Sequence, residues 1–208
     1  MRLKVLIDPD GVRALPVDCE ILRDALSLRE GCACEAPPGH RAHAVCLLLF
    51  ENPETTILSI QKADHEGYPW RDDVALPGGR IEPDDRDPTE AALRELHEEL
   101  GIHPSAVEVL GNLGHFQTYN SKADLEVIVA RWISRSALHI DPREISQVLE
   151  LPVEALVDFH KHAGFRLRAE NDIGDALIYE LPDARIWGVT ARILHEFLEL
   201  LREHGIVE

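Results

Sequence analysis

Apolar residues along the 208-residue chain form two short runs that predict a pair of buried strands. Residues 44–50 (AVCLLLF) are continuously apolar, a pattern typical of a strand that is covered on both faces. The second run, residues 55–60, follows Asn52 and Pro53, which are typical turn residues, so we expect the two strands to pair. Cys46 lies inside the first run, and we expect its side chain to belong to the core.

Three further segments have the composition of strands. Residues 124–133 (DLEVIVARWI) are rich in β-branched residues and alternate in part between apolar and polar positions. Residues 3–7 and 176–181 are shorter segments of the same kind. The chain therefore offers strands before, between and after its helical patterns.

Helical periodicity is clearest in residues 88–100. Asp87 is a suitable N-cap, Pro88 fits the first helical position, and Glu90 stands where a capping box places its acid. Gly101 provides a C-terminal stop. Amphipathic patterns also predict helices over residues 19–28 and 187–202; the core-facing positions of the last pattern are Ile186, Ile193, Phe197, Leu200 and Leu201.

Strands mixed with a few helices, without a regular βαβ repeat, predict an α+β or mixed α/β fold. Residues 31–39 (GCACEAPPG) are punctuated by Gly and Pro and read as a linker. We therefore expect an N-terminal extension over residues 1–40 that packs on a single catalytic or binding domain over residues 41–208.

Composition narrows the classes of partner. The chain has 21 Lys and Arg against 38 Asp and Glu, a formal net charge of -17, which disfavours nucleic acid and anionic membrane surfaces. No run approaches the about 20 apolar residues of a membrane span, and the first residues lack an apolar stretch of signal-peptide length. The spacing of the cysteines indicates neither a disulfide framework nor a metal site, so we expect reduced thiols and a cytoplasmic protein; these residues are Cys19, Cys32, Cys34 and Cys46.

Candidate chemistry lies on the 88–100 helix. Glu95, Glu98 and Glu99 stand at i, i+3 and i+4, which brings three carboxylates to one face. Arg94 can pair with Glu98 but cannot neutralise three acids, so a divalent cation is the natural partner, and Mg²⁺ prefers oxygen ligands. An arbitrary helix with this pattern is more often a solvated acidic face. Here the tight turn expected just upstream, at Pro77-Gly78-Gly79, allows backbone to approach the same point and favours a metal site.

Residues 79–102 resemble the Nudix box, whose usual form is G-x5-E-x7-R-E-U-x-E-E-x-G-U, with U aliphatic. The end of the box matches at every defined position: Arg94, Glu95, Leu96, Glu98, Glu99, Gly101 and Ile102. The start differs, because Asp85 replaces the Glu of the box and eight residues rather than seven separate it from Arg94. This longer form, with Glu-Pro-Asp-Asp after the glycines, is similar to the coenzyme A pyrophosphatase branch, as is IWGVTARI at residues 186–193.

The resemblance implies a Nudix fold, a mixed sheet between helices, and Mg²⁺- or Mn²⁺-dependent hydrolysis of a diphosphate bond in a nucleoside diphosphate derivative, releasing a nucleoside monophosphate. Glu95, Glu98 and Glu99 would ligate the metal together with the Gly78 carbonyl, and Arg94 would orient the glutamates. The general base is Glu95 or Glu144, since the family often recruits an acid from a later loop. The residues that flank the glycine turn and could bind substrate phosphate are Lys62, Arg71 and Arg80.

The substrate stays open at this point. The coenzyme A branch usually has Gly-Gln and then Phe before its Pro-Gly-Gly, whereas this chain has Asp72, Asp73 and Leu76 at those places. Two acids would disfavour an anionic coenzyme, so ADP-ribose, a nucleotide sugar and a dinucleoside polyphosphate are equal candidates. A non-catalytic Nudix-like nucleotide sensor or scaffold is the alternative function; such modules typically lose box glutamates, and all are present here. The superfamily also makes a homodimer an expectation.

Overall fold

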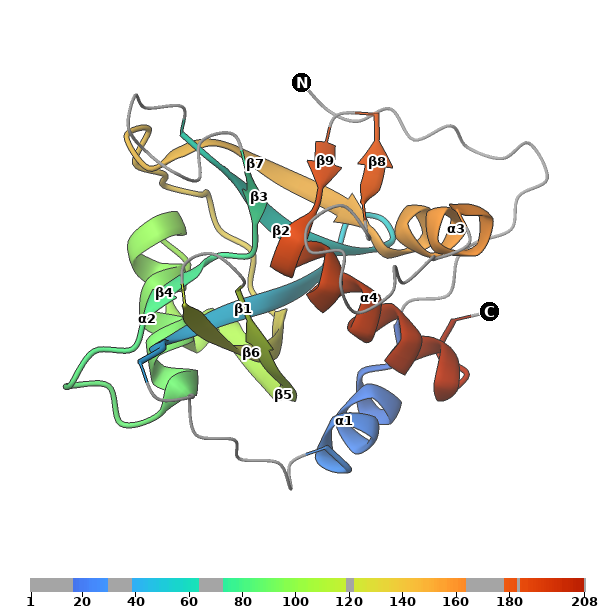
Figure 1. The fold of residues 1–208 in the computed structure, drawn as a ribbon, viewed down its shortest axis with the longest axis horizontal. Helices are drawn as coiled ribbons and strands as arrows, with labels where there is room; N and C mark the ends of the chain where they lie inside the picture. The colour runs from blue at the N-terminus through green and yellow to red at the C-terminus, as the bar shows by residue number, and fades with distance from the viewer. Residues whose placement is uncertain are drawn as a thin grey trace.

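The computed structural model describes residues 17–29, 39–63, 73–118, 122–163, 178–182 and 184–207. The strand expected over residues 3–7 and the linker residues 31–38 lie outside this part of the chain, as does Arg71. Within it, the elements form the expected mixed α/β fold, in which one mixed sheet has helices on both faces (Figure 1).

The sheet has the central order β3-β2-β1-β6-β5, and β4 pairs with β1 while β7 pairs with β2. Strands β1 and β6 are parallel, and the other pairs are antiparallel. A separate hairpin joins β8 to β9. The strands are β1 (Arg41–Glu51), β2 (Thr55–Lys62), β3 (Val74–Ala75), β4 (Gly78–Arg80), β5 (Val107–Gln117), β6 (Ala123–Trp132), β7 (Ile145–Pro152), β8 (Tyr179–Leu181) and β9 (Ala184–Ile186).

Helices cover the two faces of the sheet and divide the core in two. One apolar cluster joins Ala91, Ala92 and Leu96 of α2 to one face of β1 and β6. The other cluster lies on the opposite face and contains the buried residues of the remaining α-helices. The helices are α1 (Cys19–Ser27), α2 (Pro88–Leu100), the 3₁₀ helix η1 (Pro104–Ala106), α3 (Val153–Ala163) and α4 (Gly188–Glu203). No helix in the described ranges is long and apolar enough to cross a membrane.

The buried strand predicted over residues 44–50 is confirmed. All seven of these residues are buried, because β1 lies between β2 and β6 and is covered by α2 on one face. Cys46 is fully buried, as expected, and burial raises the pKa of its thiol. The partner strand at 55–60 and the strand at 124–133 are β2 and β6, each with slightly different ends.

Helix α2 begins and ends where its local sequence predicts. The Asp87 side chain accepts a 2.9 Å hydrogen bond from the Glu90 amide, and Gly101 adopts φ +71° at the C-terminal end. One detail of the expected capping box is wrong. The Glu90 carboxylate does not bond the Asp87 amide; it accepts hydrogen bonds from the backbone and side chain of Arg86, whose cation attracts it.

The C-terminal helix also agrees with its pattern. Trp187 serves as the N-cap of α4, so the helix starts one residue later than expected. The five apolar residues assigned to its core face are all buried: Ile186, Ile193, Phe197, Leu200 and Leu201. Helix α4 therefore packs against the face of the sheet that α2 leaves uncovered.

Candidate active site

The tight turn expected at Pro77-Gly78-Gly79 is wrong, because Gly78 and Gly79 belong to strand β4. This strand pairs antiparallel with β1 and so brings backbone directly against it at the edge of the candidate site. Gly78 has φ +147°, and a Cβ there would lie 2.4 Å from the Ala44 carbonyl oxygen. Cys46 donates to the Pro77 carbonyl, and Ile81 donates to the Ala42 carbonyl. Gly78 therefore stands opposite Val45 in a pair without ladder hydrogen bonds, so its N–H and C=O point away from β1.

Gly79 lies under the carboxylate of Glu95. A Cβ on Gly79 would meet the Glu95 carboxyl atoms at 2.4–2.8 Å, so any side chain there would displace that acid. The Glu95 side chain is only 16% exposed. Burial raises the pKa of the Glu95 carboxyl, Arg94 opposes that rise, and the charges of Glu99 and Glu98 add to it. Glycine at this position therefore makes room for a half-buried acid.

Arg94 connects the end of β4 and the segment after it to helix α2. Its Nε and NH2 donate to the two oxygens of Asp85, each at 3.0 Å, in the bidentate geometry that suits a guanidinium. NH1 donates to Glu95 at 3.0 Å and to Glu98 at 3.3 Å, while NH2 also donates to the Arg80 carbonyl at 3.0 Å. The contact with Glu98 is the one that the helix spacing predicts. Arg94 thus holds two of the three candidate ligands and the loop beneath them.

Glu99 is held from the other side. Its Oε1 lies 2.8 Å from Lys62 Nζ at the end of β2, and its Oε2 accepts a 2.9 Å bond from the Gly78 amide. Glu99 is 6% exposed, whereas Glu98 is 58% exposed. A solvated acidic face therefore describes Glu98 but not Glu99, which is buried and paired with Lys62, as a buried carboxylate must be to avoid a large desolvation cost.

The three glutamates do not converge as these side chains lie. Among the residues that the structure describes, a set of three potential metal ligands whose atoms all lie within 4.8 Å of one another occurs on α3 and α4, and not on α2. The cause is visible in the contacts, since Arg94 holds Glu95 and Glu98 while Lys62 and Gly78 hold Glu99. Each glutamate oxygen keeps a further lone pair, so this donor set of hard oxygens suits Mg²⁺ or Mn²⁺.

The other predicted site residues in the described ranges lie at the ends of β2 and β4. Glu144 is exposed in the turn before β7, and its carbonyl accepts a 2.9 Å bond from Ala63, the residue after Lys62. This contact sets Glu144 at the same end of β2 as the Lys62–Glu99 pair. The Arg80 side chain is exposed at the end of β4. Lys62 pairs with Glu99, so its first role in this structure is to neutralise that acid.

Two features were not apparent from the sequence. One is that Asp85 is the bidentate partner of Arg94. The Asp that replaces the Glu of the Nudix box therefore pairs with this arginine, although the segment between them is one residue longer. The other is a polar row on β5 and β6, in which Glu126 lies opposite His115. Across the sheet, Glu126 is also in register with Ala44 of β1, and Ala44 with Gly79 of β4, so the row leads to the site.

In that polar row, His115 Nδ1 lies 3.1 Å from Asp124 Oδ2, and the Asn112 amide donates to Glu126 at 2.5 Å. Glu126 shares its face of β6 with Ile128, which packs in the α2 cluster. The row therefore extends the polar surface of the site along the sheet. Its signal in the sequence is a pair of acids, Asp124 and Glu126, that alternate with apolar residues at the start of β6.

Asp85→Asn is expected to loosen Arg94 and to lower the free energy of unfolding by about 1–3 kcal/mol, the usual cost of losing a charged hydrogen-bond partner. The Arg94 hydrogen bonds hold the pKa of Asp85 below its ordinary value. The pair therefore stabilises the fold fully above about pH 4, and this contribution is lost as the pH falls through the lowered pKa. Urea unfolding at pH 7 and pH 3 measures the effect. The control is Asp84→Asn, at an exposed neighbour; equal losses in both variants at pH 7 would contradict the assignment.

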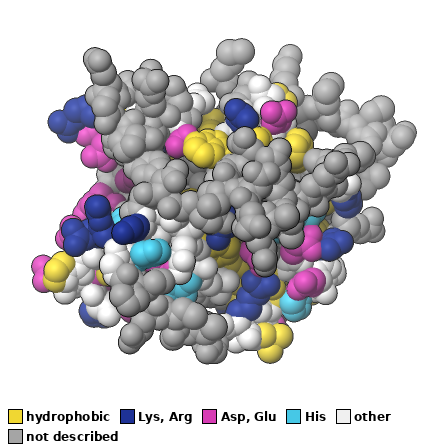
Figure 2. Space-filling view, in the orientation of Figure 1, with side chains coloured by type: hydrophobic (Ala, Val, Ile, Leu, Met, Phe, Trp, Pro, Cys, Tyr) yellow, Lys and Arg dark blue, Asp and Glu magenta, His cyan; other side chains and the backbone are white. Residues whose placement is uncertain are grey.

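Figure 2 shows acidic and basic side chains intermingled at the left edge of the molecule, beside α2. Within the site, Arg94 and Lys62 each pair with acids of α2 that would otherwise repel one another.

Sequence comparisons with known proteins all identify Nudix proteins as relatives. Residues 40–170 match the family model described as NUDIX domain. The uncharacterized Nudix hydrolase NudL of Yersinia pestis (strain Pestoides F) is 28% identical over 160 residues, which cover 77% of this chain and 79% of the relative. The NudL of Yersinia pseudotuberculosis serotype O:1b (strain IP 31758) gives the same values.

Solved structures share the fold at low sequence identity. A MutT/nudix family protein from Enterococcus faecalis has a TM-score of 0.53 at 16% identity, covering 86% of this chain and 69% of that one. A C. elegans Ap4A hydrolase in a binary complex has a TM-score of 0.51 at 15% identity, covering 77% of this chain and 98% of that one. Identities this low establish the fold alone.

Proposed function

Since the chain belongs to the Nudix hydrolase family and is a Nudix-type pyrophosphohydrolase, we propose that it hydrolyses the diphosphate bond of a nucleoside diphosphate derivative and releases a nucleoside monophosphate, with Mg²⁺ or Mn²⁺ as cofactor. One observation supports this most strongly. The Glu95 carboxylate lies directly over the Gly79 backbone, fixed by Arg94, with Glu99 and the outward-facing Gly78 beside it.

The donor set fits a hard divalent cation. Glu95, Glu98 and Glu99 supply only oxygen atoms, and the Gly78 carbonyl points to the side of β4 on which its amide meets Glu99. When bound there, the metal ion would neutralise diphosphate charge and favour ionisation of the attacking water. Arg94 and Lys62 supply positive charge beside these acids.

The chain's own residues divide the remaining work. Arg94 fixes the orientation of Glu95 and Glu98 and ties both to the 80–85 loop through Asp85. Glu95 is the better general base of the two candidates, because its carboxylate lies over the Gly79 backbone and is held there by Arg94, whereas Glu144 is exposed in the turn before β7. Arg80 and Arg71 stay as proposed phosphate ligands, and Lys62 joins them if the substrate displaces it from Glu99.

Glu95→Gln is expected to lower kcat by about 10²–10⁴-fold, the usual contribution of a general base, with a smaller change in KM. Glu144→Gln removes the same charge from an exposed turn, and we expect its kcat to fall by less than about tenfold. Steady-state kinetics of the two variants at saturating Mg²⁺ compares the candidates. If Glu144→Gln shows the larger loss, the assignment of the base to Glu95 is wrong.

For the substrate, we propose a coenzyme A-like compound, ADP-ribose or a nucleotide sugar. Asp73 stands where the coenzyme A branch usually has a polar amide. Its carboxylate accepts a 3.1 Å bond from the Trp187 indole, which directs it toward the start of α4 and reduces its repulsion of an anionic ligand. This contact keeps a coenzyme A-like substrate among the candidates.

A substrate panel identifies the compound. Coenzyme A, ADP-ribose, nucleotide sugars and diadenosine polyphosphates are each incubated with enzyme and Mg²⁺, and products are identified by mass. We expect a nucleoside monophosphate from at least one of them. Binding of a nucleotide without turnover of any compound would instead support the non-catalytic sensor.

Two wider proposals accompany the activity. We propose that residues 1–40 form an N-terminal extension of the domain over residues 41–208; in support, Leu22 and Leu26 of α1 are fully buried and Gly111 of β5 leaves the space that Leu26 fills. We also propose a cytoplasmic location, which fits the free thiols of Cys19 and Cys46.

A further inference from the structure

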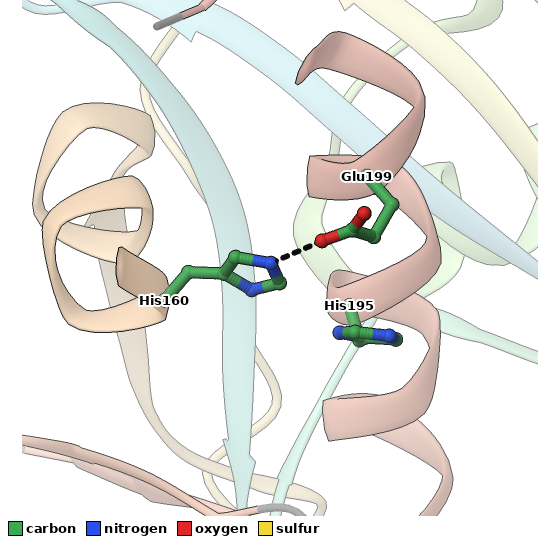
Figure 3. A group of neighbouring side chains, drawn as sticks. All are labelled: His160, His195 and Glu199. Atoms are coloured by element: carbon green, nitrogen blue, oxygen red, sulfur yellow. Dashed lines mark hydrogen bonds and ion pairs between the residues drawn. The ribbon is translucent and has the colours of Figure 1, made fainter. Parts of the chain in front are cut away.

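A second group of potential metal ligands lies on the face of the sheet opposite α2. His160 comes from α3, while His195 and Glu199 stand four residues apart on α4, so both project from one side of that helix (Figure 3). His160 Nε2 lies 2.5 Å from Glu199 Oε1, and one ligand atom from each residue falls within 4.8 Å of the others. The three side chains therefore already converge.

The environment of this group suits a bound ion. The His160 side chain is 11% exposed and that of Glu199 is 24% exposed, so the group is shielded from most water but open to an entering ion. Arg202 pairs with the other oxygen of Glu199, Oε2, which leaves Oε1 directed at His160. A partner that fixes a ligating carboxylate in this way is typical of metal sites.

The geometry requires only small adjustments. Ligands at about 2.0–2.2 Å from a tetrahedral Zn²⁺ lie about 3.3 Å apart, so His160 and Glu199 would separate by less than an ångström. The rings of His160 and His195 stack at 5.1 Å between centroids with 29° between planes, and rotation of the His195 side chain can bring a nitrogen to the same ion. The metal would replace the proton between His160 and Glu199.

We propose that His160, His195 and Glu199 bind one Zn²⁺ or a similar first-row transition-metal ion and thereby fasten α3 to α4. Two imidazoles and one carboxylate favour such metals over Mg²⁺, in contrast to the all-oxygen set of α2. Because α3 and α4 share an apolar cluster that is separate from the α2 cluster, this site is distinct from the proposed catalytic one. Three protein ligands leave a fourth position for water.

Zinc titration by calorimetry, on chelator-treated protein, tests the proposal. The background is the Glu98→Gln/Glu99→Gln variant, so that zinc at the α2 acids does not contribute. We expect about one Zn²⁺ per chain, with affinity reduced about 100-fold or more in His195→Gln and in Glu199→Gln. Zinc should also raise the Tm of the background protein but not that of these two variants.

The matched control is His97→Gln, which removes an exposed histidine from α2 and should leave zinc binding unchanged. Circular dichroism establishes that each variant is folded. Should one variant not fold, X-ray absorption of the zinc-loaded wild-type chain reports directly whether imidazole nitrogens ligate the ion. Zinc affinity equal in all variants, or a zinc spectrum without imidazole ligands, would overturn the proposal.

Discussion

Glu98→Gln together with Glu99→Gln is expected to lower kcat by about a thousandfold or more while the protein stays folded. The two changes remove two carboxylates from the proposed metal site, and metal ions contribute several kcal/mol of charge stabilisation at about 1.4 kcal/mol per tenfold in rate. Turnover of the best substrate from the panel, measured across a Mg²⁺ titration, checks the prediction.

The two glutamates differ in structural role, which sharpens the experiment. Glu99 is buried against Lys62, so Glu99→Gln also leaves that cation without its carboxylate. Glu98 is mostly exposed, and its single replacement should reduce activity with little effect on Tm. Glu90→Gln, on the same helix, is the matched control and should change kcat less than about twofold. An equal loss of kcat in Glu90→Gln would show that removing any negative charge from α2 lowers activity, and that the loss is not specific to the metal site.

Gly78→Ala is expected to destabilise the fold by about 3 kcal/mol or more, a large fraction of the stability of a typical domain. Its new Cβ would lie 2.4 Å from the Ala44 carbonyl oxygen and 2.6 Å from Val45 Cα, and neither backbone atom can move without distorting β1. The residue also has φ +147°, which side-chain-bearing residues rarely adopt. Urea unfolding followed by circular dichroism measures the loss.

Two other glycines separate the causes. Gly114→Ala tests backbone conformation alone, because Gly114 has φ +129° with nothing within 4 Å of a Cβ, and it should destabilise less. The nearest atoms to a Cβ at Gly79 all belong to the flexible end of Glu95, so we expect Gly79→Ala to fold but to have a reduced kcat. Normal activity in Gly79→Ala would contradict the placement of Glu95 over the backbone of β4.

The parts of the fold that follow local rules could be predicted from the sequence. Helix α2 begins at Pro88 after its Asp87 cap and ends at Gly101, and β1 is an unbroken apolar run. Strand β5 was not recognised, because its register shifts at Gly111 and Gly114 interrupt the alternation. Strand β7 and helix α3 were also not predicted, because the helix begins directly after the strand, without a turn signal between them.

Part of the candidate site could likewise be predicted from the sequence, and part could not. The three glutamates and Arg94 lie on one helix, so their spacing alone indicated shared chemistry. The contacts that position them join distant segments, as Lys62 does with Glu99 and Asp85 with Arg94. The His160–Glu199 contact has the same origin, since α3 and α4 meet only in the folded chain. Such pairs depend on tertiary packing and leave no periodic signal.

We propose that the enzyme hydrolyses a nucleoside diphosphate derivative through the acids of α2 and a divalent cation. The most direct measurement is ³¹P NMR of the panel's best substrate with wild-type enzyme, before and after addition of Mg²⁺. We expect the diphosphate resonances to be stable in chelator and to give way to phosphate monoester resonances once Mg²⁺ is present. Hydrolysis at the same rate in chelator, or none with Mg²⁺ or Mn²⁺ on any compound of the panel, would contradict it.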